Sequence, residues 1–278
     1  MKIVSDSSSN VRNITSDIEF KSVPLKILVD DKEFVDDVNG NVQEMVDYLK
    51  TTKSKSSTSC PNSQDYLSAF ENSEEIIVLT LTSALSGSYN ASETAQKEYL
   101  KGDLKAKVFC FDTLTTGPEM SLIIDKIVEL YNNGENFESI VEKIKEYKKH
   151  THLVFLLKSL RNLANNGRVS PIVAKISSLI GIEIISKASD EGTIKPLKKV
   201  IGKKKGLFTL YEEIKKNGFN GGKITIAHCF NESGVNDLKA MILKDFPSAN
   251  IKVEECGMLC SFYAENGGIL VGFEDYKN

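Results

Sequence analysis

The sequence predicts an α/β fold of two α/β domains, the first with a mainly parallel sheet covered by helices and the second with a mixed sheet. In the first half, continuous apolar runs alternate with amphipathic helical stretches, which is typical of a parallel sheet with helices on both faces. In the second half, hairpin-like segments are mixed with strand–helix–strand crossovers. A chain of 278 residues can hold two such domains, and we place them at residues 1–155 and 156–278.

The first half begins with a strand at Lys2–Ser5, followed by a loop rich in helix-capping residues. Strands are predicted where apolar residues run without interruption, and helices where they recur at helical spacing. Pro118 suits the first turn of its helix because its φ is already helical. The loops that start at Ser5, Thr80 and Asp112 leave the carboxyl ends of strands, so we expect them to converge. After the first strand, the expected elements are extended segments at Phe20–Val29 and Lys32–Val35, helices at Val42–Thr51 and around Tyr66–Phe70, a strand at Ile76–Leu81, a helix at Tyr89–Leu100, a strand at Lys107–Phe111, helices at Pro118–Tyr131 and Phe137–Lys149, and a strand at Leu153–Leu157.

The second half begins with a short helix, which the segment Asn165-Asn166-Gly167 ends. Ser170-Pro171 then opens another helix. The turn Ser189-Asp190-Glu191-Gly192 joins two strands into a hairpin. The expected elements are helices at Lys158–Ala164, Ser170–Ile180, Leu207–Lys216 and Glu232–Phe246, and strands at Ile182–Ser186, Thr193–Val200, Lys223–His228, Asn250–Val253, Met258–Tyr263 and Gly268–Phe273.

Composition and charge argue against several classes of function. A formal net charge of -3 gives no attraction to nucleic acid or to an anionic membrane. Arginine carries most bidentate recognition of phosphates and bases, and it occurs only at Arg12, Arg161 and Arg168. No apolar run approaches the ~20 residues of a membrane span. We therefore expect neither nucleic-acid binding nor stable membrane insertion.

The cysteines favour a reducing compartment. Their number is odd, there is no CxxC pair, and the chain opens directly on a strand without a signal peptide. Cys256 and Cys260 have no histidine nearby, which favours buried free thiols over a metal site or a disulfide. We expect a cytoplasmic location and no bound metal. The five cysteines are Cys60, Cys110, Cys229, Cys256 and Cys260.

Two hydroxyl-rich loops form the most informative candidate site. They are Ser57-Thr58-Ser59-Cys60-Pro61 and Thr80-Leu81-Thr82-Ser83-Ala84-Leu85-Ser86-Gly87-Ser88-Tyr89. Hydroxyls and free backbone N–H groups at helix starts make a site for an oxyanion, and Gly87 allows close approach of the backbone. Neither loop contains lysine, arginine or histidine, and the chain has no GxxxxGK[ST] motif and no GxGxxG after a strand. The loops therefore indicate a carboxylate or weakly charged ligand held by neutral donors.

Two basic features have alternative interpretations. Arg168 follows Gly167 in a turn close to a helix start. Its side chain either anchors the carbonyls of this turn or faces the cleft as a fixed cation, and we favour the cleft. The turn Gly202-Lys203-Lys204-Lys205-Gly206 is either a solvated lysine cluster or a docking patch for an acidic partner or a phosphate.

The histidines raise the alternative of a hydrolytic site. His228 ends a strand, where it would serve as a general base or a cysteine partner, although a strand-end histidine is more often structural. His150 and His152 flank a strand start and are expected to be exposed. No local pattern such as GxSxG identifies a nucleophile. An enzyme that acts on a small acyl or carbonyl substrate through His228 or a loop serine is therefore the alternative hypothesis.

Several motifs together resemble the DegV family, the bacterial fatty-acid-binding proteins. They occur in family order and spread over most of the chain. The serine loop and the Gly-Arg-Val-Ser turn are specific, whereas the opening Asp-Ser is weak alone. The matching segments are Asp6-Ser7-Ser8, Thr58-Ser59-Cys60-Pro61, Ser83-Ala84-Leu85-Ser86-Gly87-Ser88-Tyr89 followed by Ala91, Asp112-Thr113, and Leu160 through Asn166-Gly167-Arg168-Val169-Ser170.

The resemblance implies a lipid between the two domains. In such proteins hydroxyls of the two loops hold the carboxylate, and the acyl chain runs into an apolar tunnel. Carried over here, Thr58 and Ser86 are the main carboxylate contacts, with Ser83 and the Gly87 amide as supports and with Ser59 and Arg168 completing the site. The protein is then a fatty-acid carrier without catalytic residues, and its ligand is the fatty acid itself, with no other cofactor.

The resemblance also bears on partners. Some members present the bound fatty acid to a separate ATP-dependent kinase, and the fold is similar to that of dihydroxyacetone kinases. On this reading Lys203, Lys204 and Tyr263 are candidates for a partner-facing surface. A lipid-responsive regulator whose lysine turn docks a partner is a third hypothesis.

Three positions depart from the family pattern. Ile201 stands where members often carry an arginine before the glycine that matches Gly202, and Tyr263 stands at about the place of a histidine. Cys60 replaces a commoner polar residue. The departures at Ile201 and Tyr263 affect the expected interaction with a kinase more than they affect lipid binding.

Overall fold

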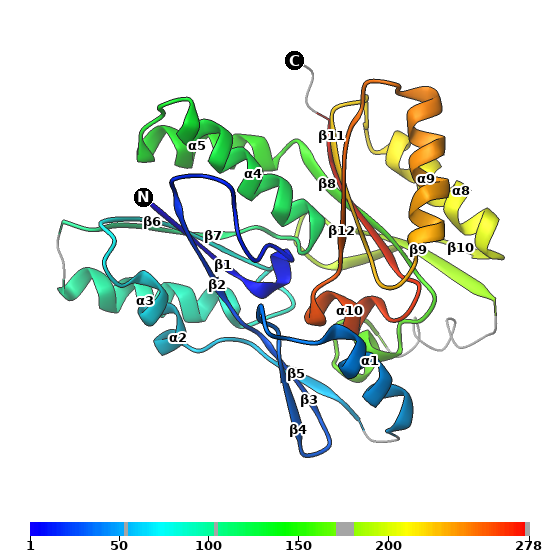
Figure 1. Ribbon diagram of the computed structural model, residues 1–278, viewed down its shortest axis with the longest axis horizontal. Helices are drawn as coiled ribbons and strands as arrows, with labels where there is room; N and C mark the ends of the chain where they lie inside the picture. Colours follow the sequence, from blue (N-terminus) through cyan, green and yellow to red (C-terminus); the bar gives the residue numbers. More distant parts are fainter. Residues whose placement is uncertain (53–54, 103–104, 171–180, 276–278) are drawn as a thin grey trace.

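The computed structural model describes residues 1–52, 55–102, 105–170 and 181–275, and Figure 1 shows their arrangement. The described strands form a four-stranded, a six-stranded and a three-stranded sheet. The larger two build separate lobes that face each other (Figure 1). This α/β architecture with one parallel and one mixed sheet confirms the predicted fold class. The helix expected at 171–180 lies outside the described residues.

The four-stranded sheet is parallel throughout, in the order β2-β1-β6-β7. Successive side chains of a strand point to opposite faces, which explains why these apolar runs are buried on both sides. Ile77 and Leu79 pack in one core with α4 and α5, whereas Ile76 and Val78 pack in another with α2 and α3. The elements are β1 (Lys2–Asp6), β2 (Glu19–Val23), β6 (Glu75–Thr80), β7 (Lys107–Asp112), α2 (Ser63–Phe70), α3 (Ser88–Gly102), α4 (Pro118–Asn132) and α5 (Phe137–Lys148).

The loops after these strands converge, as expected. A short 3-10 helix, η1 (Ser7–Ser9), follows β1, and its Ser8 carbonyl accepts a hydrogen bond from Gly117 N at 2.8 Å. Thr82 N donates to Thr115 O at 3.0 Å. The carboxyl edge of the parallel sheet is therefore one connected surface.

A small antiparallel sheet, in the order β4-β3-β5, extends from this edge. The segment expected to run unbroken over Phe20–Val29 is divided, because the chain leaves the parallel sheet at Pro24 and enters the small one. Proline has no N–H for a strand ladder, so it suits this crossing point. The elements are β3 (Lys26–Val29), β4 (Lys32–Val35), β5 (Ser57–Ser59) and α1 (Val42–Thr51).

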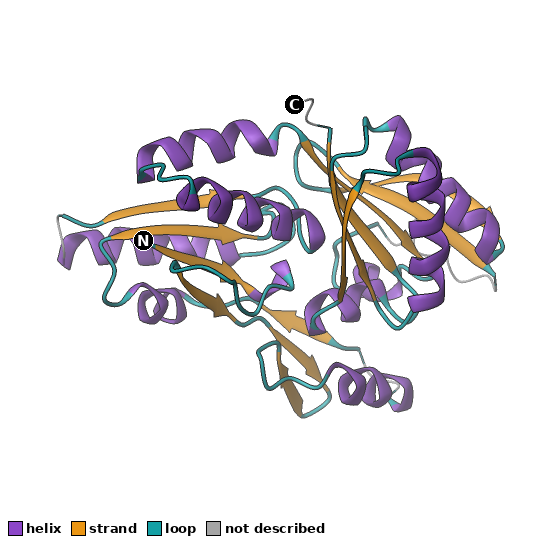
Figure 2. Ribbon diagram, turned by 45° about the horizontal axis from the view of Figure 1, so that its top comes forward, coloured by secondary structure: helices purple, strands orange, loops and turns teal. Residues whose placement is uncertain are grey.

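The six-stranded sheet has the order β10-β9-β8-β13-β11-β12, and only β11 and β12 pair in parallel. Helices α8 and α9 cover its outer face (Figure 2). The predicted domain boundary after residue 155 falls inside β8, all of which lies in this sheet, and the division into two domains stays a prediction. The elements are β8 (Thr151–Leu157), α6 (Arg161–Asn165), β9 (Ile182–Ala188), β10 (Ile194–Ile201), α8 (Lys203–Lys216), β11 (Lys223–His228), α9 (Glu232–Asp245), β12 (Asn250–Glu255), α10 (Met258–Ala264) and β13 (Ile269–Glu274).

The strand expected at Met258–Tyr263 is wrong, because this segment forms the helix α10. The reason lies far away in sequence. The buried Asp36 carboxylate accepts hydrogen bonds from Met258 N at 2.8 Å and from Leu259 N at 3.2 Å, which are amides of the first turn of α10. Such amides lack partners inside their own helix, so a carboxylate from the small-sheet segment stabilises the helical conformation.

Helix α4 joins the two lobes. Its first turn lies so close to β13 that a Cβ added at Gly272 would stand 2.4 Å from Glu119 N. Only a glycine permits this approach. Further along α4, Asp125 pairs with Lys252 at 3.0 Å and Glu129 pairs with Lys223 at 2.5 Å. The two lobes are thus held together beside the space between them.

Candidate functional site

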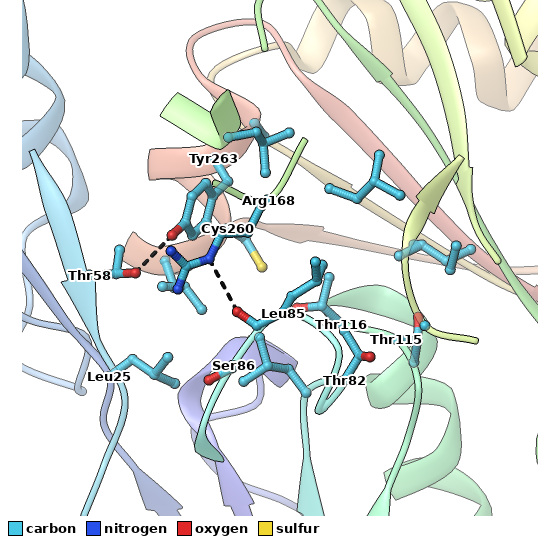
Figure 3. Close-up of a pocket in the computed structure, with 18 of the residues that line it drawn as sticks. Leu25, Thr58, Thr82, Leu85, Ser86, Thr115, Thr116, Arg168, Cys260 and Tyr263 are labelled. Atoms are coloured by element: carbon cyan, nitrogen blue, oxygen red, sulfur yellow. Dashed lines mark hydrogen bonds between the residues drawn. The ribbon is translucent and has the colours of Figure 1, made fainter. Parts of the chain in front are cut away.

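A cavity of about 330 Å³ lies between the edge of the parallel sheet and the inner face of the six-stranded sheet (Figure 3). One cluster of hydroxyl groups lies at the end with Thr58, the threonines Thr82, Thr115, Thr116 and Thr193 line the wall elsewhere, and most of the remaining lining is apolar. Leu153, Phe155 and Leu157 alternate along β8, so one face of that strand forms part of the wall. The other lining residues used below come from β5, from the loops after β6, β7 and α6, from the β9–β10 hairpin and from α10.

The hydroxyl end brings the two predicted loops together. Thr58 and Ser59 of β5 line it from one side, and Ser86 and Gly87 of the second loop line it from the other. The close-up in Figure 3 shows the Thr58 hydroxyl directed at the tyrosine of α10. These are four of the six residues that the sequence proposed for a ligand carboxylate.

Ser86 is oriented by its own helix. Its Oγ accepts a hydrogen bond from Ser88 N at 3.2 Å, at the start of α3. Because the oxygen accepts from the backbone, the hydroxyl proton is left to donate elsewhere. Ser86 lines the cavity, so this geometry suits it to bind an acceptor oxygen of a ligand there.

Beneath this loop lies a buried carboxylate that the sequence indicated only as a capping residue. Asp6 has no exposed surface, and its Oδ2 accepts from Leu81 N at 2.9 Å and from Ser88 Oγ at 2.6 Å. Its Oδ1 accepts from Ser8 N at 3.2 Å and from Ser8 Oγ at 2.5 Å. Burial raises the pKa of Asp6 to about 6, against the opposing effect of these hydrogen bonds. One carboxylate therefore ties the loop after β1 to both ends of the serine loop.

Arg168 satisfies both of its proposed interpretations. Its Nη1 donates to Asn166 O, which anchors the turn, and its Nε donates to Leu85 O at 3.1 Å, which links the turn to the serine loop. Among the described lining residues, Arg168 is the only one that carries a charge. Asn166 adds a second link, since its Nδ2 donates to Ser56 O at 3.2 Å beside β5.

Tyr263, a candidate for a partner-facing surface, instead lines the cavity. Its hydroxyl lies 2.7 Å from Thr58 Oγ1. Burial raises the pKa of this phenol, so it stays protonated. A fourth hydroxyl therefore stands at the hydroxyl end beside those of Thr58, Ser59 and Ser86, and the sequence did not indicate its contact with Thr58, which joins residues far apart in the chain.

Three other predicted residues lie away from the cavity. Ser83 is exposed and outside the lining, and its amide donates to Asp112 Oδ1 at 3.1 Å. Lys203 and Lys204 are exposed in the first turn of α8, where Lys203 Nζ donates to Ser233 Oγ at 2.9 Å. The segment expected as a turn is thus the first turn of α8, and its lysines belong to the outer surface and not to the hydroxyl site.

The histidines do not support a catalytic site. His228 is buried, and its Nδ1 accepts from Asn231 N at 3.3 Å, which is a structural contact at the start of α9. His150 and His152 both contact Asp275, at 3.0 Å and 2.9 Å, so they are partly paired and not simply exposed. None of the three lines the cavity.

The described residues also bear on metal binding and on membrane insertion. No group of three or more histidine, cysteine, aspartate or glutamate side chains in this part of the chain is placed to hold a metal ion. Among its helices, none has both the length and the apolar character that crossing a membrane requires.

Comparison with known proteins gives the family. Residues 1–274 match the family model described as "Uncharacterised protein, DegV family". The chain belongs to the DegV family. A DegV domain-containing protein of Streptococcus pneumoniae (strain ATCC BAA-255 / R6) is 38% identical over 276 residues, which are 98% of each chain. The resemblance inferred from the sequence motifs is thereby confirmed.

Solved DegV structures share the whole fold. A DegV family protein from Eubacterium eligens, loaded with heptadecanoic acid, is 37% identical and has a TM-score of 0.96 over 99% of each chain. The Fatty Acid Kinase (Fak) B3 protein of Streptococcus pneumoniae, loaded with linoleic acid, is 38% identical and has a TM-score of 0.97 over 99% of each chain. Both of these DegV relatives were crystallised with a long-chain fatty acid.

Proposed function

We propose that this DegV protein binds a long-chain fatty acid in the cavity between its lobes, and that it acts as a carrier. The observation that carries the proposal is the two-part lining, in which the hydroxyls of Thr58, Ser59, Ser86 and Tyr263 gather with Arg168 at one end and the rest of the wall is mostly apolar. A fatty acid has this same division between a carboxylate and a hydrocarbon chain. The fatty acids bound by two relatives at 37% and 38% identity support the assignment.

The carboxylate lies at the hydroxyl end in this proposal. Thr58 and Ser86 donate hydrogen bonds to it, and Tyr263, Ser59, Gly87 and Arg168 surround it. Ser83, which lies outside the cavity, takes no part. The carboxylate must keep hydrogen bonds when it leaves water, and neutral hydroxyl and amide donors can supply them. Each hydrogen bond to a charged group adds about 1.5–3 kcal/mol to the binding free energy.

The acyl chain supplies most of the affinity. Burial of one methylene is worth about 0.8 kcal/mol, so roughly fifteen methylenes gain on the order of 10 kcal/mol before the costs of binding. The carboxylate contacts add less than this, and their main effect is to fix the orientation of the ligand. The β8 face that carries Leu153, Phe155 and Leu157 is the wall along which the chain lies.

The proposal also includes a protein partner. We propose that the loaded protein presents its carboxylate to a separate fatty-acid kinase, which the identity of 38% to the Fak B3 protein supports. Ile201, Lys203 and Lys204 are exposed near the start of α8 and are candidates for the contact. A partner that uses ATP, together with free cysteines, favours a cytoplasmic location, which stays a prediction.

Titration of delipidated protein with a fatty acid and with its methyl ester tests the site. The ester keeps the hydrocarbon chain and loses the charge, so we expect the acid to bind about tenfold or more tightly. Equal affinity for the two ligands would contradict the assignment of the carboxylate. No binding of either ligand would contradict the proposed function as a whole.

A further inference from the structure

The end of the cavity opposite to the hydroxyl end is closed by a contact between the lobes. In Figure 3, Thr82 and Thr115 lie across the cavity from Thr58. The turn between β9 and β10 reaches this place and contributes Gly192 and Thr193 to the lining. The turn therefore meets the loop after β6 at the far end of the space.

The contact between the turn and the loop leaves no free volume. A Cβ added at Gly192 would stand 2.0 Å from Thr82 Oγ1 and 3.2 Å from Leu114 Cα. Gly192 also has a φ of +75°, a conformation that favours glycine. The backbone of the turn at Gly192 thus packs against the Thr82 side chain of the opposite lobe. This contact closes the wall of the cavity there.

The turn is also held firmly in its own conformation. Ser189 O accepts from Gly192 N at 2.9 Å, and Ser189 N donates to Thr193 O at 2.8 Å. Ser189 Oγ accepts from Glu191 N at 3.2 Å and from Thr193 N at 3.1 Å. One serine thereby satisfies most of the polar backbone groups of the turn, which makes it a fixed stop.

A small side chain borders the free space of the cavity next to this turn. Ala188 is the last residue of β9, it pairs with Ile194 across the hairpin, and both line the cavity. Leu153 of β8 stands beside them in the sheet, because β8 and β9 pair at Val154 and Lys187. The free length of the cavity therefore depends on how far the residue at position 188 projects.

We propose that the β9–β10 turn is the stop for the methyl end of the acyl chain, and that Ala188 is a specificity-determining residue that sets the maximal chain length. The inference rests on the proposed function, because it needs the carboxylate at the Thr58 end. It goes beyond that function by naming what limits the ligand. The contact between Gly192 and Thr82 keeps this limit fixed.

The test is a titration with saturated fatty acids from decanoic to eicosanoic acid. For the unmodified protein, affinity rises about fourfold per added methylene until the chain reaches the stop, and then rises no further. In Ala188→Leu the break comes about three methylenes earlier, because leucine adds three carbons at the wall. Leu153→Ala enlarges the same end and moves the break to longer chains. Lys195→Ala, an exposed change on the same hairpin, leaves it in place.

The outcomes separate the two proposals. If both cavity variants still bind and affinity levels off at the same chain length as in the unmodified protein, the length limit is overturned. The proposed function then still stands. An unmodified protein that binds none of the acids would overturn both. A shift of the expected sign in either variant supports the stop, so the test remains decisive if one of the two variants folds poorly.

Discussion

The Ser88 hydroxyl donates a hydrogen bond to the Asp6 carboxylate at 2.6 Å, and this bond joins the end of β1 to the first residue of α3. Ser88 Oγ also lies 2.6 Å from the Tyr66 hydroxyl. The amide of the same Ser88 donates to Ser86 Oγ. The proposed carboxylate site is therefore built on a second, buried carboxylate that fixes the loop from below.

Replacement of Asp6 should loosen this loop. Asp6→Asn puts an amide group where a carboxylate oxygen now accepts from two donors, so at least one buried donor loses its partner. We expect the free energy of unfolding to fall by about 3 kcal/mol, as measured by urea denaturation. Asp17→Asn, at an exposed position, is the control and should change little. Equal stability of the two variants would show that Asp6 does not hold the loop.

Glu254 predicts a pH dependence of stability. Burial raises its pKa to about 7 from 4.5, against the lowering effect of Lys252, Asn10 and Ser121. A raised carboxyl pKa means that the folded state binds more protons than the unfolded state between these values. Stability should therefore fall as the pH rises from about 4.5 to about 7.

Glu254→Gln removes this titration. We expect the variant to be more stable than the unmodified protein above pH 7, by about 1 kcal/mol. Below pH 7 its stability should change less with pH than that of the unmodified protein. Thermal unfolding across the pH range measures both effects. The exposed neighbour offers the control Glu255→Gln, and a profile in which the two variants behave alike would refute this role of Glu254.

The two loop hydroxyls should each contribute to fatty-acid affinity. Thr58→Ala and Ser86→Ala each remove one donor to the carboxylate, and we expect each to weaken binding about tenfold or more. Isothermal titration with palmitic acid measures the loss. Ser83→Ala is the matched control, because Ser83 belongs to the same loop and lies outside the cavity. A double variant that binds as tightly as the unmodified protein would remove the carboxylate assignment.

Tyr263 should act together with Thr58. Tyr263→Phe keeps the ring that packs against Phe262 and removes the hydroxyl 2.7 Å from Thr58 Oγ1. We expect a weakening of about threefold to tenfold, and a smaller effect of Thr58→Ala when the phenol is already absent. Strictly additive losses in the double-variant cycle would mean that the two hydroxyls bind independently.

Much of the fold follows from local sequence signals. The strands β6 and β8 are predicted by their uninterrupted apolar runs, and Asn62 and Asp65 form a local capping box at the start of α2. The two hydroxyl loops are predicted by their position after strands and before helices, and the resemblance to the DegV family then points to Thr58 and Ser86 within them. These signals depend only on residues that lie close together in the chain.

The remaining features depend on residues far apart in the chain. Helix α10 forms where Asp36 accepts from its first amides, a contact between positions more than two hundred residues apart. Tyr263 was a partner-face candidate because of its match to a family position, and its contact with Thr58 arises from the packing of α10 against β5. Asp6 was interpreted as a cap of its own loop, which is correct, but its bonds to Leu81 and Ser88 arise only when two strands lie side by side.

In the proposed complex the cavity holds one fatty acid, with its carboxylate between Thr58 and Ser86. The most direct measurement is mass spectrometry of the intact protein freshly purified from its cells, followed by extraction and identification of any lipid. We predict one long-chain fatty acid per chain, and its loss from the Thr58→Ala, Ser86→Ala double variant. A protein that carries no fatty acid, and that takes up none when it is offered, would contradict the account.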